Sequence, residues 1–359
     1  MANRITGSTD TTGAISVRPK SVKSLLLVCE STVTDGGATP EVIYTVTGTN
    51  DAKAKFGETA SKLVKVLVNN GADNIKCIAI GKYGEGSSYE TVSAAYEGAF
   101  NASLADTSIK CVIIDKVEQS VVTMLKSHLQ IAESEDMFRY GVVGLLADTD
   151  DAAVVEAGTI NEKRIFAPFP KFVDAENNVL TGIYGAAGLA AKIMSETSDP
   201  AMPMNGVEFT GFGGTTMPLL KANKTNLEQG GVTAIVGGSS PAIWRLVTTR
   251  TKDSEGKPDP IYHEGTTLFI ADDILETVIT TLQATYKRTK NTTRILDAIR
   301  TTVIGILETK EALEIIENFD KNTVSVVQDP EDIYGALVDY EFDVVTPLYT
   351  ITITQHMKL

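Results

Sequence analysis

The fold class follows from one segment of the chain, Thr59-Ala-Ser-Lys-Leu-Val-Lys-Val-Leu-Val-Asn-Asn-Gly-Ala-Asp-Asn-Ile-Lys-Cys-Ile-Ala-Ile80. Its first half places apolar residues such as Leu63 and Leu67 on one face, which predicts an amphipathic helix. Gly71 is expected to end this helix, because glycine accepts the left-handed backbone conformation that often follows a last helical turn. The apolar run at 75–80 then predicts a buried strand.

An earlier apolar run at 24–29 completes the order strand, helix, glycine turn and strand, which is a βαβ-type unit. Short apolar runs continue to alternate with amphipathic segments through the middle of the chain. This alternation predicts a largely parallel α/β sheet with helices on both faces. Further strands are expected at 41–46, 109–114, 140–147, 164–169, 207–212 and 233–236, and helices at 89–100, 117–133, 149–158, 184–194 and 219–228.

The final third of the chain changes character after an expected strand at 244–249. Two long amphipathic helices are expected within 268–307, and a third helix at 311–319. Strands at 324–327 and 341–354 then close the chain. We therefore expect a C-terminal α+β domain after the α/β core.

The composition is that of an ordinary globular protein, with 359 residues of which 43% are hydrophobic and 22% charged. That length exceeds one comfortable hydrophobic core, so two or three subdomains are expected. No apolar run approaches the roughly eighteen residues that span a bilayer, and the first residues lack a secretory signal, so synthesis in the cytosol is expected. The net charge of −14 argues against nucleic-acid binding, which needs a basic face.

The catalytic and cofactor motifs that we sought are incomplete in this sequence. Gly81-Lys82 is not followed by the Ser or Thr of a phosphate-binding loop. Gly211-Phe-Gly213 has Thr216 where a dinucleotide-binding turn needs its third glycine, and Gly237-Gly-Ser239 lacks the last glycine of a nucleophile elbow. We expect these glycines to form tight turns at strand ends.

Metal chemistry is not indicated either. No two histidines share the spacing of a metal site, and the cysteines are scattered through strand-like apolar runs. We expect the cysteines to be core residues rather than disulfide partners or zinc ligands. The histidines are His128, His263 and His356, and the cysteines are Cys29, Cys77 and Cys111. The sequence therefore predicts no catalytic, cofactor-binding or metal-binding residue, and no cofactor.

Charge is segregated along the final third of the chain. Basic side chains dominate 287–300, and acidic side chains dominate 308–343. Each cluster can be a solvated face, or the two can be complementary docking surfaces that steer identical subunits together. The basic side chains that we take as candidate binding residues are Lys287, Arg288, Lys290 and Arg294.

Both ends of the chain carry short alternating patterns. Tyr349, Ile351 and Ile353 alternate with threonines, which is the period-two signature of a strand. Ile15 and Val17 form an alternating apolar pair in an otherwise polar N-terminal arm. A terminal strand either tucks into the sheet of its own chain or joins the sheet of a neighbour, since an unpaired edge attracts another strand.

Several segments, taken in order, also carry a family resemblance. They are Phe56-Gly57 with the helix and strand that lead to Ile80, then 222–235, 244–252, the helical pair 268–307 and the closing strand 343–355. This ordered set spans nearly the whole chain. It resembles the tail sheath proteins of contractile phage tails and of phage tail-like bacteriocins, the R-type pyocin and diffocin group.

The resemblance implies a structural polymer without catalytic chemistry, so the chain is expected not to be an enzyme. It also implies a subtilisin-like α/β core without a protease triad, together with a C-terminal α+β domain and extended linking strands at both ends. The expected divisions are 1–22 (N-terminal linking arm), 23–100 (N-terminal βαβ-type region), 101–240 (α/β core), 241–342 (C-terminal α+β domain) and 343–359 (C-terminal linking strand).

The function implied by the resemblance is that of a contractile sheath. Copies polymerise as stacked hexameric rings around an inner tube, and the metastable helical polymer contracts to drive the tube through a target envelope. The strand residues at the two ends are expected to link copies by β-augmentation: Ile15, Val17, Tyr349, Ile351 and Ile353. The basic residues at 287–294 are expected to face the tube, and the alternative is a solvated helix turn.

The resemblance also implies the partners and the place of action. Expected partners are other copies of the chain, the inner tail tube protein, and baseplate and tail terminator proteins, with no nucleic acid and no direct membrane insertion. The chain is expected to be made in the bacterial cytoplasm and released on lysis as part of a virion tail or tail-like particle. Two other functions stay open from the residues alone: a soluble α/β enzyme with an unrecognised active site, and another self-assembling shell protein.

Overall fold

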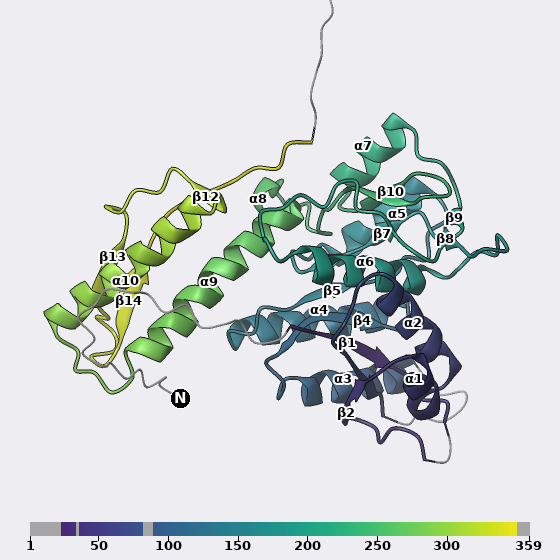
Figure 1. Cartoon of the computed structure of the whole chain (residues 1–359), viewed down its shortest axis with the longest axis horizontal. Coiled ribbons are helices and arrows are strands. Elements are labelled where there is room, and N and C mark those ends of the chain that lie inside the picture. The colour runs from purple at the N-terminus through teal and green to yellow at the C-terminus, as the bar shows by residue number, and fades with distance from the viewer. Residues whose placement is uncertain (1–22, 34–35, 82–88, 350–359) are drawn as a thin grey trace, which may run out of the picture. The chain divides into compact units, whose positions relative to one another are not determined.

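The chain folds into two compact units in the computed structural model, which describes residues 23–33, 36–81 and 89–349. The larger unit contains the described residues of 23–198 and 202–268, and Leu348 and Tyr349 rejoin it. The smaller unit is built mainly from residues 269–347. Figure 1 labels the elements of both units.

A six-stranded sheet forms the centre of the larger unit, in the order β2-β3-β1-β4-β5-β6. Its strands run parallel to their neighbours except β2, which pairs antiparallel with β3. The largely parallel α/β sheet predicted from the sequence is therefore confirmed. The strands are β1 (Ser24–Cys29), β2 (Ile43–Val46), β3 (Ile75–Ala79), β4 (Ile109–Ile114), β5 (Tyr140–Val142) and β6 (Ile165–Phe166).

Helices cover both faces of this sheet. On one face, Leu26 and Val28 of β1 share a hydrophobic cluster with Phe100 of α3 and Leu125 of α4. On the other face, α6 packs on β1, β4 and β5 and also contacts α2 (Figure 1). The helices of this unit are α1 (Thr49–Phe56), α2 (Glu58–Asn69), α3 (Tyr89–Ser103), α4 (Gln119–Ser134), α5 (Asp150–Ile160), α6 (Gly182–Glu196), α7 (Lys221–Gln229) and α8 (Pro260–His263).

The turn at Gly71 and the close approach of Gly182 to Gly144 explain why this arrangement forms. Gly71 has a φ of 99°, and the amide of Ala72 donates back to the carbonyl of Leu67, so the helix α2 ends where the sequence predicts. Gly182 begins α6 against Gly144, and a Cβ added to either glycine would lie 2.4 Å from backbone atoms of the other segment. The Gly/Ala-rich character of α6 therefore allows it to lie directly on the sheet.

The cysteines are part of the core of the sheet, as predicted. Cys29, Cys77 and Cys111 lie in β1, β3 and β4, and all three are free and buried. Burial raises the pKa of each thiol well above its usual range. The thiols therefore stay protonated and act as small apolar side chains.

A second, smaller set of strands lies beside the main sheet in the larger unit. The predicted strand at 164–169 divides into β6 and β7, which belong to different sheets. The predicted strand at 207–212 is wrong, because this segment makes only an isolated bridge from Glu208 to Ala242. The strands are β7 (Pro168–Phe169), β10 (Thr233–Val236) and β11 (Ala242–Arg245) in one sheet, and β8 (Phe172–Val173) and β9 (Gly214–Thr215) in another.

The smaller unit has a core of its own, in which Ile274, Val303, Ile306 and Leu307 pack together. The predicted third helix at 311–319 is wrong. The chain leaves the helix at Leu313 and forms a short strand that pairs antiparallel with β15. The elements are α9 (Gly265–Thr285), α10 (Thr293–Ala312), β12 (Ile316–Glu317), β13 (Ser325–Gln328), β14 (Ala336–Asp339) and β15 (Asp343–Val344).

Candidate intersubunit interface

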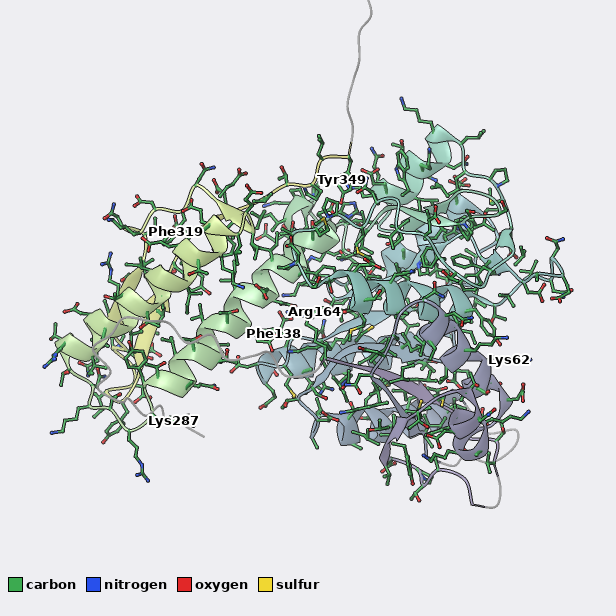
Figure 2. All side chains as sticks on the ribbon, in the orientation of Figure 1. Lys62, Phe138, Arg164, Lys287, Phe319 and Tyr349 are labelled. Carbon is green, nitrogen blue, oxygen red and sulfur yellow. The ribbon has the colours of Figure 1, made fainter. Side chains whose placement is uncertain are left out.

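Tyr349 is the one residue of the predicted arm set that the structure describes, and it is held by its own chain (Figure 2). Its hydroxyl donates a hydrogen bond of 2.7 Å to Oε1 of Glu264. Its ring lies 4.6 Å from the guanidinium carbon of Arg245, measured to the ring centroid. Ile15, Val17, Ile351 and Ile353 lie outside the described residues, so their predicted pairing stays a prediction.

Arg245 organises this contact. Its Nε donates to Oε2 of Glu264 at 2.8 Å, and its Nη1 donates to Glu228. Burial alone would lower the pKa of Arg245, but the two carboxylates outweigh burial and raise it. Burial and the Glu264 carboxylate raise the pKa of the Tyr349 hydroxyl, so it remains a hydrogen-bond donor. We call Tyr349, Arg245, Glu264 and Glu228 the Tyr349 clasp.

The clasp gives no local signal in the sequence. Arg245 ends β11 and Glu264 directly precedes α9, and both lie about a hundred residues before Tyr349 in the chain. No spacing rule connects such positions, because only the tertiary fold brings them together. The alternation around Tyr349 identifies a strand pattern but not these partners.

The predicted basic residues gather at the turn between α9 and α10 in the smaller unit. Lys287, Arg288, Lys290 and Arg294 are all exposed, and Arg288 adopts a φ of 57°. Figure 2 labels Lys287 just after the end of α9. None of the four forms an ion pair with another residue in the described part of the chain. Their charges are therefore available to a partner, which is what a docking surface requires.

The predicted acidic segment meets this basic turn. Asn291 donates from Nδ2 to the carbonyl of Gly335 at 3.0 Å and to that of Ile333 at 3.3 Å. These carbonyls belong to the turn between β13 and β14, which also contains Asp329 and Asp332. The two charge clusters are thus neighbours within one unit rather than features of separate regions.

The β13–β14 hairpin is a second candidate surface, and only β13 was predicted from the sequence. Val327 and Leu337 are directly opposite in the register, and their side chains are 50% and 48% exposed. The opposite pair, Val326 and Val338, is half-buried, and Val338 packs on the core of the smaller unit. Among the described residues, β13 and β14 pair only with each other, so each strand presents an outer edge.

The larger unit also contains a buried polar cluster that the sequence did not predict. Arg139 is fully buried and donates to Ser103 Oγ at 3.2 Å and to the backbone carbonyls of Ser103 and Asp106. Its Nη1 also lies 3.1 Å from Nε2 of His128, whose ring stacks on Phe100. Burial, and then the charge of Arg139, lower the pKa of His128 to about 3. The histidine is therefore a neutral core residue.

Within 23–33, 36–81 and 89–349, no group of three or more His, Cys, Asp or Glu side chains is placed to hold a metal ion. The helices of the same described segments include none that is both long and apolar enough to cross a bilayer.

Comparison with known proteins gives a family match at the C-terminal end of the chain. Residues 257–358 match the family model of the phage tail sheath C-terminal domain. This segment contains the whole of α9 and α10, the basic turn and the β13–β14 hairpin. No curated protein sequence matches the chain.

Solved structures extend the similarity to almost the whole fold. The contracted helical sheath of the anti-feeding prophage aligns with a TM-score of 0.72 at 14% identity, over 98% of both chains. The sheath tail protein Lin1278 of Listeria innocua aligns with a TM-score of 0.69 at 10% identity, over 92% of this chain and 94% of that one. A sheath tail protein of Desulfitobacterium hafniense aligns with a TM-score of 0.66 at 10% identity, over 91% and 98%.

The fold is therefore that of a contractile-tail sheath protein. The match of residues 257–358 to the phage tail sheath C-terminal domain model agrees with the resemblance stated from the sequence. The expectation of a structural protein rather than an enzyme is confirmed by the same family.

Proposed function

We propose that this chain is the structural subunit of a contractile tail sheath, whose copies polymerise around an inner tube and shorten to drive the tube through a target envelope. The observation that carries this function is the family match over 257–358, joined to a sheath fold over more than nine-tenths of the chain. Shortening needs two packings of the same subunits that differ in buried area and charge pairing, with the difference released cooperatively along the stack.

The chain ends are proposed to join copies through shared sheets. Ile15, Val17, Ile351 and Ile353 would supply the paired residues of the linking strands. The β13–β14 hairpin is the proposed acceptor, because an isolated two-stranded hairpin is marginally stable and gains from added strands. Support comes from its free outer edges and from the exposed apolar pair Val327 and Leu337.

The proposed organisation of the chain keeps the divisions expected from the sequence. Residues 1–22 and 343–359 are linking arms, 23–100 is the N-terminal region, and 241–342 is the C-terminal domain. The core at 101–240 is proposed to be subtilisin-like without a protease triad. Support for that finer assignment is the parallel pairing of β4, β5 and β6, with helices on both faces of their sheet.

The proposed partners follow from the surfaces. The exposed basic side chains Lys287, Arg288, Lys290 and Arg294 are assigned to weak ionic contacts with the inner tube, which can break when the sheath shortens. Baseplate and tail terminator proteins are assigned to the two ends of the polymer. The particle is proposed to form in the bacterial cytoplasm and to leave the cell on lysis.

Deleting residues 350–359 tests the linking function. The truncated chain keeps Tyr349 and both cores, so we expect it to fold with a melting temperature close to that of the full chain. It is expected to remain monomeric in size-exclusion chromatography and to form no striated tubes in negative-stain micrographs when co-expressed with the tube protein. Long tubes formed by the truncated chain would contradict the linking role.

A further inference from the structure

We propose that Tyr349 is the anchor of the C-terminal linking arm. The Tyr349 clasp holds this residue to its own subunit, so that the part of the chain that reaches another copy begins after position 349. This inference rests on the proposed function, in which the end of the chain links copies together. It assigns to Tyr349 a positioning role that differs from the strand pairing expected from its sequence pattern.

The clasp is attached to well-fixed parts of the fold. Arg245 lies in β11, which pairs with β10 in the three-stranded sheet. Glu264 is buried and forms a backbone bridge with Val247. Arg245 is itself braced by Glu228 of α7. Tyr349 therefore contacts side chains whose own positions are fixed by a sheet and two helices.

Two different interactions hold Tyr349, which makes the contact specific for tyrosine. The hydroxyl donates to a charged acceptor that is largely shielded from water, a type of hydrogen bond stronger than one between neutral groups. The ring covers the guanidinium of Arg245 and gains a cation–π contact. The preceding residue Leu348 is exposed, which shows that the chain is held at Tyr349 rather than along its length.

The anchor fixes the reach of the arm. Without the clasp, the last described element before Tyr349 is β15, which ends at Val344. The clasp therefore moves the point at which the arm leaves its subunit from position 344 to position 349. An extended chain spans at most about 3.3–3.6 Å per residue, so the reach of the arm is shorter by about 17–18 Å. A link of one defined length keeps the distance between joined copies uniform along a polymer.

Proteolysis of the full-length chain tests whether Tyr349 contacts Arg245 and Glu264 in solution. Chymotrypsin cleaves after an aromatic residue only when that side chain can leave its contacts. Tyr349→Phe keeps the ring but loses the hydroxyl, and Glu264→Ala removes the acceptor. In both variants we expect cleavage after position 349 to accelerate by about tenfold or more, because a charge-assisted hydrogen bond is lost. Val155→Ala, at an exposed position of α5 far from the cleaved bond in the sequence, is the matched control, and it should leave that rate unchanged.

Circular dichroism and the melting temperature establish whether each variant is folded. Tyr349→Phe provides the decisive comparison if Glu264→Ala proves unstable, since it removes one oxygen atom at the surface of the unit. Cleavage after position 349 at the wild-type rate in a folded Tyr349→Phe chain would overturn the proposal.

Assembly provides the second test. Tyr349→Ala leaves residues 350–359 intact, so copies should still join, but the repeat along the tubes should become irregular and the layer lines in their micrograph transforms should blur. Tubes with the wild-type repeat and sharp layer lines would reject the anchor. The deletion of 350–359 separates the two ideas: tubes formed without the arm reject the linking function, whereas arm-dependent tubes with wild-type order in Tyr349→Ala reject only the anchor.

Discussion

Arg139 and His128 show how single side chains can be essential to the fold and still play no part in chemistry. Arg139 is 0% exposed and His128 is 3% exposed. The hydrogen bonds of Arg139 go largely to backbone carbonyls and to Ser103. Nδ1 of His128 and Nε of Arg139 have no hydrogen-bond partner within the described segments. Burial and the nearby charge of Arg139 make a second positive charge at His128 costly.

This cluster predicts that acid destabilises the larger unit. The unfolded chain binds a proton at His128 below about pH 6.5, whereas the folded chain does so only near its pKa of about 3. Lowering the pH through this window therefore favours unfolding. Between pH 7 and pH 5 we expect His128 to account for a loss of about 2 kcal/mol in the free energy of unfolding. Urea denaturation at the two pH values measures this loss in the free energy of unfolding.

The variant His128→Gln isolates the effect. Glutamine keeps an acceptor for Arg139 and cannot become charged, so the difference in stability between pH 7 and pH 5 should shrink by that amount. His263→Gln removes a histidine from the same unit without touching Arg139 and serves as the control. An equal pH dependence in wild type and His128→Gln would show that the histidine is protonated in the folded protein.

At the scale of elements, sequence patterns correctly predicted the helices and strands whose formation depends on local interactions. The helix α2, the turn at Gly71 and the strand β3 follow from periodicity and from the backbone freedom of one glycine. The third helix expected at 311–319 did not form. Glu314 and Asn318 adopt positive φ, and the strand β12 between them pairs with β15 near the chain end. That distant pairing overrides the helical pattern, and no local pattern reveals it.

The same limit applies to the candidate interface. The basic residues at 287–294 were identified from composition, and the structure places them on one exposed turn. Their contact with the acidic hairpin turn depends on Asn291, which carries no charge and therefore no compositional signal. The strand β14 was missed because its exposed residues do not alternate with buried ones.

The α9–α10 turn carries its own prediction. The double charge reversal Arg288→Glu and Lys290→Glu should leave folding unchanged, because exposed charges without ion pairs contribute little to stability. It should reduce co-purification of the chain with the tube protein by about tenfold or more at low salt, because attraction becomes repulsion. The control is Lys62→Glu with Lys65→Glu on the exposed face of α2. Equal recovery of tube protein by wild type and by the turn variant would reject tube contact at this turn.

At the scale of the whole molecule, the chain contains separate hydrophobic cores. One cluster joins the main sheet to α3 and α4, and another joins α9 and α10 to the hairpin region. The larger unit is discontinuous in sequence, since Tyr349 returns to it after the smaller unit. Two units with separate cores can unfold in separate transitions.

Calorimetry of the full chain should therefore resolve more than one transition. Ile306→Ala opens a cavity in the smaller unit, and Leu63→Ala opens one beneath α2 in the larger unit. Each should destabilise its own unit by about 2–5 kcal/mol and leave the other transition in place. A single transition that both substitutions shift equally would show that the units unfold together.

The position of the cysteines has a practical consequence for any particle built from many copies of this chain. Oxidation and disulfide exchange begin with the thiolate anion, and the three sulfur atoms lie in central strands where burial keeps them protonated. Air and prolonged storage then find no reactive thiol in the folded protein. Preparations should keep without a reducing agent, and alkylating dyes should label the chain only after it is denatured.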